Sequence, residues 1–128
     1  MAELHWKNLF LVFAGGGAGS VLRFVITKLS LQWFAAYPAG TLAANLLGAL
    51  IAGIAAVLIF EKHLIVPPWN DLVLAGFLGG LTTFSTMILD AYRLAQHGLA
   101  LAAVIYIFVN VVLGASLFAF AQWIARAA

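Results

Sequence analysis

Cysteine is absent from this 128-residue sequence and charge is scarce, because only 8% of the residues are Asp, Glu, Lys or Arg. Without cysteine there is no disulfide framework, no thiolate metal site and no redox-active thiol pair. A soluble domain carries roughly 25% charged residues. Six basic and four acidic side chains cannot cover a water-facing surface of this size. The composition, which is 66% hydrophobic, therefore predicts an integral membrane protein.

Clusters of basic or catalytic side chains are also missing. The six Lys and Arg residues are scattered singly, whereas nucleic-acid-binding domains gather them on one face. Acid–base or metal chemistry needs paired acids, a base beside a nucleophile, or a ligand cluster. The acids and histidines are all expected at or near the ends of helices: Glu3, Glu61, Asp71, Asp90, His5, His63 and His97. The sequence thus favours neither a nucleic-acid partner nor an enzyme.

Four long apolar runs make up nearly the whole chain. A helix needs about 20 apolar residues to cross the hydrocarbon core, and the runs at about 8–29, 39–60, 70–95 and 99–124 meet that length. The strands of a membrane barrel would show alternation over ~10 residues instead. No linker or soluble region separates the runs. We therefore predict an all-α protein in which residues 1–128 form a single four-helix transmembrane domain.

The positive charges are evenly divided between the two sides of such a bundle. One side receives Lys7, Lys62 and Arg126, and the other receives Arg23, Lys28 and Arg93. This balance leaves the positive-inside rule without a preference. Either something other than charge orients the protein, or the chain inserts both ways, which would allow an antiparallel dimer.

Few polar groups fall inside the four runs. Arg23 either snorkels to the membrane surface or faces a water-filled vestibule that attracts anions. Asn45 and Asn110 lie deep in the second and fourth runs, where an amide either joins helices or presents N–H donors to an anion. Tyr106 lies one turn before Asn110 on the same helix face.

Small residues recur at a spacing that lets helices approach closely. Gly15 and Gly19 form one such pair in the first run, and Gly48 and Ala52 form another in the second. Pairs of this kind mark tightly packed helix faces in membrane proteins.

The third run contains the stretch GGLTTFST at residues 79–86. Ser and Thr in membrane helices commonly bond back to the preceding turn, but in this stretch four hydroxyl side chains follow two glycines within eight residues. A break at this depth would free backbone groups, which is tolerated only where protein or a water-filled cavity receives them. Discontinuous helices of this kind form ion sites in transporters. We therefore predict a functional break near the middle of the third helix.

Three stretches together resemble the Fluc/CrcB family of fluoride channels. They are GSVLR at 19–23, GTLAAN at 40–45 and GFLGGLTTFST at 76–86. Each is weak alone, but their order, spacing and four-span context extend the resemblance over essentially the whole chain.

The resemblance implies an architecture and an activity. Family members are dual-topology antiparallel homodimers with two fluoride pores and a central structural Na⁺ at the dimer axis. By this resemblance, the backbone carbonyls of Gly79 and Thr82 from both subunits would hold the Na⁺. The activity would be passive export of fluoride from the cytoplasm across the inner membrane, with lipid and a second copy of the chain as partners.

The resemblance also assigns pore residues. They are Arg23, Thr41, Asn45, Phe84, Ser85, Met87, Tyr106 and Asn110. Phenylalanine suits an anion path because its ring edge is positive. Met87 stands where the family has a second pore phenylalanine, and Gly114 stands where the polar track of the fourth helix would continue after Asn110. These two departures bear on the transport rate and on the path of the ion.

Two other functions remain open from the residues. A small proton-coupled multidrug exporter has a similar length and span number, but it needs a membrane-embedded carboxylate in its first helix. Here Glu3 precedes that helix. A non-transporting assembly subunit, packed through its glycine faces, would show no anion flux.

Overall fold

Helices form almost the entire computed structural model, which describes residues 5–128, so that Glu3 lies outside the described residues. Two of the four long helices are uninterrupted: α1 (Trp6–Leu31) and α6 (Ala100–Ala127). The second is α2 (Ala39–Ala56), which continues into the π-helical turn η1 (Val57–Glu61). The third consists of α3 (Trp69–Asp71), the π-helical η2 (Leu72–Leu78), α4 (Gly79–Leu81) and α5 (Phe84–Gln96). All four are long and apolar enough to cross a membrane, as predicted.

The helix ends coincide with residues that cannot continue a helix easily. Pro38 precedes α2, and the Pro67–Pro68 pair precedes α3. At the end of α5, Gly98 adopts a φ of +79°, a left-handed conformation that glycine adopts without steric cost. Its N–H donates to the carbonyl of Ala95 at 3.0 Å. The chain can therefore reverse sharply into α6.

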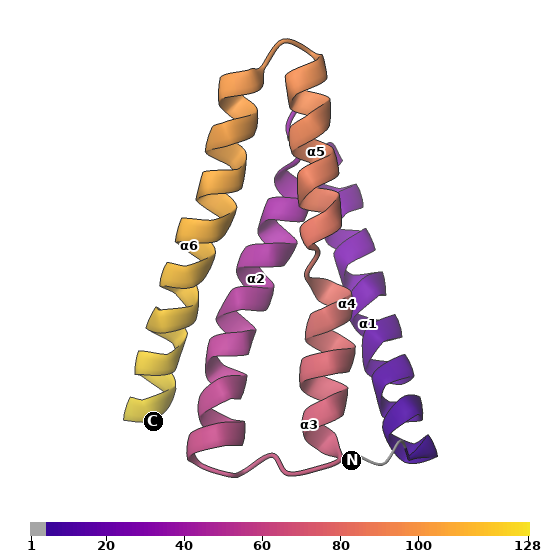
Figure 1. Ribbon diagram of the computed structural model, residues 1–128, viewed down its shortest axis with the longest axis vertical. Helices are drawn as coiled ribbons and strands as arrows, with labels where there is room; N and C mark the ends of the chain where they lie inside the picture. Colours follow the sequence, from indigo (N-terminus) through magenta and orange to yellow (C-terminus); the bar gives the residue numbers. More distant parts are fainter. Residues whose placement is uncertain (1–4) are drawn as a thin grey trace.

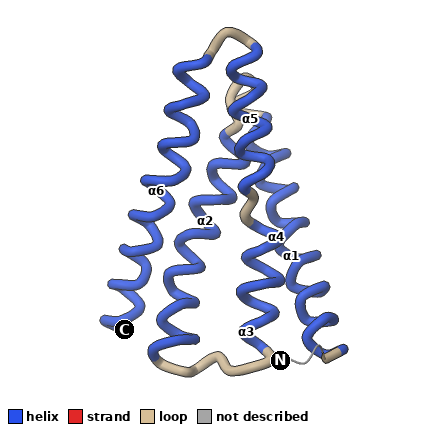
Figure 2. The backbone as a smooth tube through the Cα atoms, viewed as in Figure 1, coloured by secondary structure: helices blue, strands red, loops and turns tan. Residues whose placement is uncertain are grey.

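The four helices run side by side along one long axis (Figures 1 and 2). The start of α1, the C-terminus and the loop between η1 and α3 lie at one end, and the α5–α6 turn lies at the other. α1 packs along η2 and α4, while α2 contacts both α1 and α6. The third helix is visibly interrupted between α4 and α5 (Figure 2). That interruption separates a half packed on α1 from a half packed on α6.

Glycine brings the backbones of α1 and the third helix into direct contact. A Cβ on Gly19 would overlap the carbonyl oxygen of Phe77 and lie 2.8 Å from the nitrogen of Leu81. A Cβ on Gly80, on the facing helix, would lie 2.9 Å from the nitrogen of Ser20. Because the blocking atoms are backbone, no side chain can move aside. The close contact predicted for the glycines of the first run is confirmed.

Large apolar side chains lie mostly on the outside of the chain. The largest fully buried side chains are Tyr106, Leu81 and Val57, whereas Phe13, Phe84 and Phe108 are exposed. A soluble protein rarely exposes so continuous an apolar surface. These faces suit lipid or another apolar chain, in agreement with the composition.

Candidate functional site

The third helix is interrupted at Thr82 and Thr83, as the sequence predicts. Thr82 has φ −89° and ψ 155°, and Thr83 has φ −154° and ψ 119°. Both residues are thus extended between two helical segments. The interruption lies midway along the chain's long axis (Figure 2). Backbone polar groups at this depth need partners other than those of a regular helix.

Asn45 supplies those partners from α2. Its Oδ1 accepts from the N–H of Thr83 at 2.8 Å, and its Nδ2 donates to the carbonyl of Thr83 at 3.2 Å. The same Nδ2 donates to Oδ1 of Asn110 on α6 at 3.0 Å. Both N–H groups of Asn45 therefore have acceptors within the chain. Asn45 bonds to both backbone groups of the extended residue Thr83 and connects three helices, which agrees with the helix-joining interpretation of this amide.

Backbone carbonyls lose their α-helical donors at the break, those of Gly79 and Thr82 among them. In a continuous helix, the N–H of Thr83 would donate to Gly79 and the N–H of Thr86 to Thr82. Here the N–H of Thr83 is taken by Asn45, and the N–H of Thr86 donates to Oγ1 of Thr83 at 3.2 Å. Gly79 is exposed, and a Cβ there would meet only the carbonyl of Leu74, at 3.9 Å. These are the two residues to which the resemblance assigns Na⁺.

Arg23 caps the end of the first half-helix. Its Nε donates to the carbonyl oxygen of Gly80 at 2.9 Å. A positive charge is favourable there, because helix C-termini carry partial negative charge. Neither interpretation of Arg23 from sequence, snorkelling or lining a vestibule, includes this contact. The structure adds this contact, in which the side chain reaches the third helix, and the two interpretations stay predictions.

Hydroxyl groups gather at the start of the second half-helix. Thr83 is the N-cap of α5, since its Oγ1 accepts from the N–H of Thr86. The same oxygen donates to Oγ1 of Thr86 at 3.1 Å and lies 3.4 Å from Oγ of Ser85. Ser85 is exposed. The stretch 82–86 therefore uses its hydroxyls for capping and also presents one of them on the outer face.

A hollow of about 270 Å³ adjoins the break and brings together several of the expected residues. Its lining comes from α2, the break, α5 and α6: Asn45, Thr82, Thr83, Phe84, Met87, Asn110 and Val111. From Asn110 the polar contacts continue along α6, because its Nδ2 donates to the carbonyl of Tyr106 at 2.9 Å. Ser116, beyond Gly114, is exposed and bonds back to Val112 of its own helix.

Phe84 and Met87 stand in different surroundings. Phe84 is 74% exposed, and Gly79 and Ser85 near it in the sequence are exposed too. Met87 is only 4% exposed and belongs to an apolar cluster with Ala91, Leu94, Ala103 and Tyr106. A phenylalanine at 87 would have to fit this packed cluster. The thioether at 87 thus contributes to the core as well as to the wall of the hollow.

Thr41 and Tyr106 share one acceptor, Asp90. Oγ1 of Thr41 donates to Oδ2 of Asp90 at 2.6 Å, and the hydroxyl of Tyr106 lies 3.4 Å from the same oxygen. The ring of Tyr106 is fully buried and meets Tyr37 edge-on at 5.8 Å. Asp90 was expected at or near a helix end. It lies in α5 toward the α5–α6 turn and joins that helix to α2 and α6.

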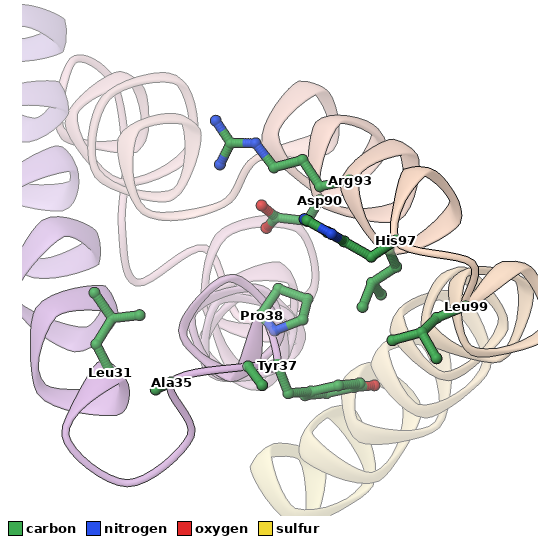
Figure 3. Close-up of a pocket in the computed structure, with 10 residues that line it drawn as sticks. Leu31, Ala35, Tyr37, Pro38, Asp90, Arg93, His97 and Leu99 are labelled. Atoms are coloured by element: carbon green, nitrogen blue, oxygen red, sulfur yellow. The ribbon is translucent and has the colours of Figure 1, made fainter.

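Asp90 also borders a second hollow, of about 440 Å³, near the α5–α6 turn (Figure 3). Figure 3 shows Asp90, Arg93 and His97 projecting from α5 on the side that faces Tyr37 and Pro38. The hollow is therefore lined by an acid and two basic side chains together with apolar residues. It lies between the break and the α5–α6 end of the chain.

Sequence reasoning missed the roles of Thr83 and Asp90. Thr is one of the residues preferred at a helix N-cap, so Thr83, directly before the second half of the third helix, could have been singled out. Asp90 had no comparable signal, because its two hydroxyl partners come from distant parts of the chain.

Known proteins are similar to this chain over nearly its whole length. A family model described as CrcB-like protein, Camphor Resistance (CrcB), matches residues 10–122. A relative named Fluoride-specific ion channel FluC, from Burkholderia ambifaria (strain MC40-6), is 38% identical over 120 residues, which is 94% of each chain. Another of that name, from Escherichia coli O17:K52:H18, is 40% identical over 116 residues, or 91% of each chain. This chain is therefore a multi-pass membrane protein that belongs to the CrcB family of fluoride channels.

Proposed function

We propose that this protein is a fluoride-selective channel that lets fluoride leave the cytoplasm passively. The relatives are named fluoride-specific ion channels, and their similarity covers nearly all of the chain. The observation that carries the proposal within this chain is the break at Thr82–Thr83. It sets an exposed phenylalanine, a hydroxyl cluster and two asparagines around one hollow at mid-depth.

Fluoride would meet donors and ring edges along this path. Because fluoride is small and strongly hydrated, a pore must replace its water with donors and still allow exit. The proposed lining is Arg23, Thr41, Asn45, Phe84, Ser85, Met87, Tyr106 and Asn110. The second N–H of Asn110 and the hydroxyl of Ser85 are the donors best placed for this, since both N–H groups of Asn45 already have acceptors. Asn45 would act chiefly by holding the break in place.

The working unit in this proposal is an antiparallel homodimer of single-domain chains, with two pores. Phe84, Ser85 and Gly79 are exposed on one chain, so a second copy would complete the surroundings of the path. The even division of basic residues between the two ends supports insertion both ways. Because the chain lacks cysteine, Ala128→Cys would test this directly. A membrane-impermeant thiol reagent should label about half of the chains from each side of the membrane; labelling from one side only would exclude dual topology.

A structural Na⁺ at the dimer axis is part of the proposal. The carbonyls of Gly79 and Thr82 fit a hard cation, which prefers oxygen ligands, because both have lost their helical donors. The ion would supply positive charge that holds the two breaks together. Protein prepared in choline salts should gain thermal stability on addition of Na⁺, with one Na⁺ bound per two chains. No gain would remove the ion from the proposal and leave the channel intact.

Fluoride efflux from liposomes containing the purified protein tests the central claim. A fluoride electrode should record rapid release, and matched chloride-loaded liposomes should release nothing. Silence from a sample shown to be dimeric would favour the assembly-subunit alternative. Release that requires a proton gradient would favour the exporter, although residues 6–31 of the first helix contain no acid.

A further inference from the structure

Two adjoining hollows lie where α1 begins and α3 follows the Pro67–Pro68 pair. They measure about 510 and 500 Å³ and share Trp6, Lys7 and Pro68 in their walls. We call them together the N-terminal groove. They lie at the end of the molecule that also holds the C-terminus, remote from the break (Figure 1).

The N-terminal groove changes from polar to apolar along α1. The first hollow adds Asn8 to its wall, and the second adds Phe10, Leu11 and Trp69. Phe10 lies one turn further along α1 than Trp6, about 6 Å deeper by helical rise. Trp6 is 86% exposed and Trp69 is 58% exposed, and tryptophan prefers the membrane–water boundary. This gradient matches an amphiphile with its head at the helix ends and its chain toward the bilayer centre.

Lys7 supplies a positive charge at the polar end of the N-terminal groove, and this charge can pair with a bound anion. Lys7 forms no hydrogen bond or ion pair with the described residues, whereas Arg126, at the same end of the molecule, is paired with Glu61 at 2.6 Å. Asp71, the acid at the start of the third helix, accepts from Nδ2 of Asn8 at 2.9 Å. A carboxylate partner for Lys7 is therefore not supplied by residues 5–128.

We propose that the N-terminal groove binds an anionic phospholipid. The ammonium of Lys7 pairs with the head-group phosphate beside Asn8. One acyl chain lies along Phe10 and Leu11, between Trp6 and Trp69. A zwitterionic lipid fills the apolar part equally well but gains less from Lys7. The site is independent of the proposed ion path, so it stands or falls separately from the fluoride activity.

Native mass spectrometry of the full-length protein with added lipid tests this site. Phosphatidylglycerol should bind in preference to phosphatidylcholine, and Lys7→Gln should weaken phosphatidylglycerol binding about fivefold, since a lysine near anionic lipid contributes roughly 1 kcal/mol. Lys28→Gln is the matched control, because Lys28 lies on the same helix near its other end, over the Phe24 ring. Equal losses in both variants would show a general charge effect and overturn the site.

The apolar part of the groove needs a variant of its own. Trp69→Ala should weaken both lipids by a similar factor, because it shortens the wall of the acyl-chain hollow without changing the charge. Competition by inorganic phosphate at the concentration of the lipid would show a simple anion site and overturn the proposal. Lipid adducts confined to monomers would show that a second copy of the chain covers the groove. This result would also overturn the proposal.

Discussion

Replacing Asn45 with leucine is the sharpest test of how the break is held. Leucine has a similar volume, so Asn45→Leu removes the amide without leaving a large cavity. The change deletes both bonds to Thr83 and the bond to Asn110. The extended N–H of Thr83 would then lie at mid-bilayer depth without its acceptor.

The magnitude follows from the number of bonds lost. Interhelical hydrogen bonds in membranes contribute about 0.6 kcal/mol on average and at most about 1.7 kcal/mol. With three bonds lost, we expect the unfolding free energy to fall by about 2 kcal/mol, and by no more than about 5 kcal/mol. Asn45→Asp should be at least as destabilising as Asn45→Leu, because a carboxylate at this depth is desolvated and would set an oxygen against two acceptors, the carbonyl of Thr83 and Oδ1 of Asn110.

Two measurements on the same samples decide the role of Asn45. Unfolding by SDS titration in mixed micelles gives the free energy, and electrode-detected efflux gives the fluoride flux. Ser116→Ala is the control, since Ser116 bonds only within its own exposed helix face, and it should change stability by less than about 0.5 kcal/mol. If Asn45→Leu unfolds like the wild type yet loses flux, Asn45 serves the ion and our assignment to the break is refuted.

Further substitutions test three other parts of the structure. Gly19→Ala should lower stability by about 1–3 kcal/mol in a thermal-melt assay, as overpacking does. Gly17→Ala should be neutral in the same assay, because nothing lies within 4 Å of its Cβ position. Equal effects of the two substitutions would refute the close backbone contact at Gly19. Phe84→Ile should keep the dimer by size-exclusion chromatography but nearly abolish fluoride flux, and wild-type flux would remove Phe84 from the path. Arg23→Gln should lower stability by about 1 kcal/mol through loss of the charge at the end of α4. Arg23→Lys should lower it less in the same titration, and equal losses would show that the charge is not what matters.

The number, type and approximate extent of the helices were determined by the sequence alone. Continuous hydrophobicity of spanning length forces a helix, because only internal hydrogen bonds satisfy the backbone in lipid. The position of the break was readable for a similar local reason. Two glycines followed by four hydroxyl residues offer the backbone alternatives to regular helix, and the structure is extended at Thr82 and Thr83.

The partners of these groups were decided only by the tertiary structure. Asn45 meets Thr83 across 38 positions of sequence, and Arg23 meets Gly80 across 57. Such pairs depend on how the helices are rotated and shifted against one another, which the glycine contacts between α1 and the third helix set. A nearly uniform apolar sequence carries little information about rotation, because every face of each helix is compatible with lipid. For this reason the sequence indicated only that Asp90 lies at or near a helix end. The packing of the helices showed that Asp90 joins Thr41 and Tyr106.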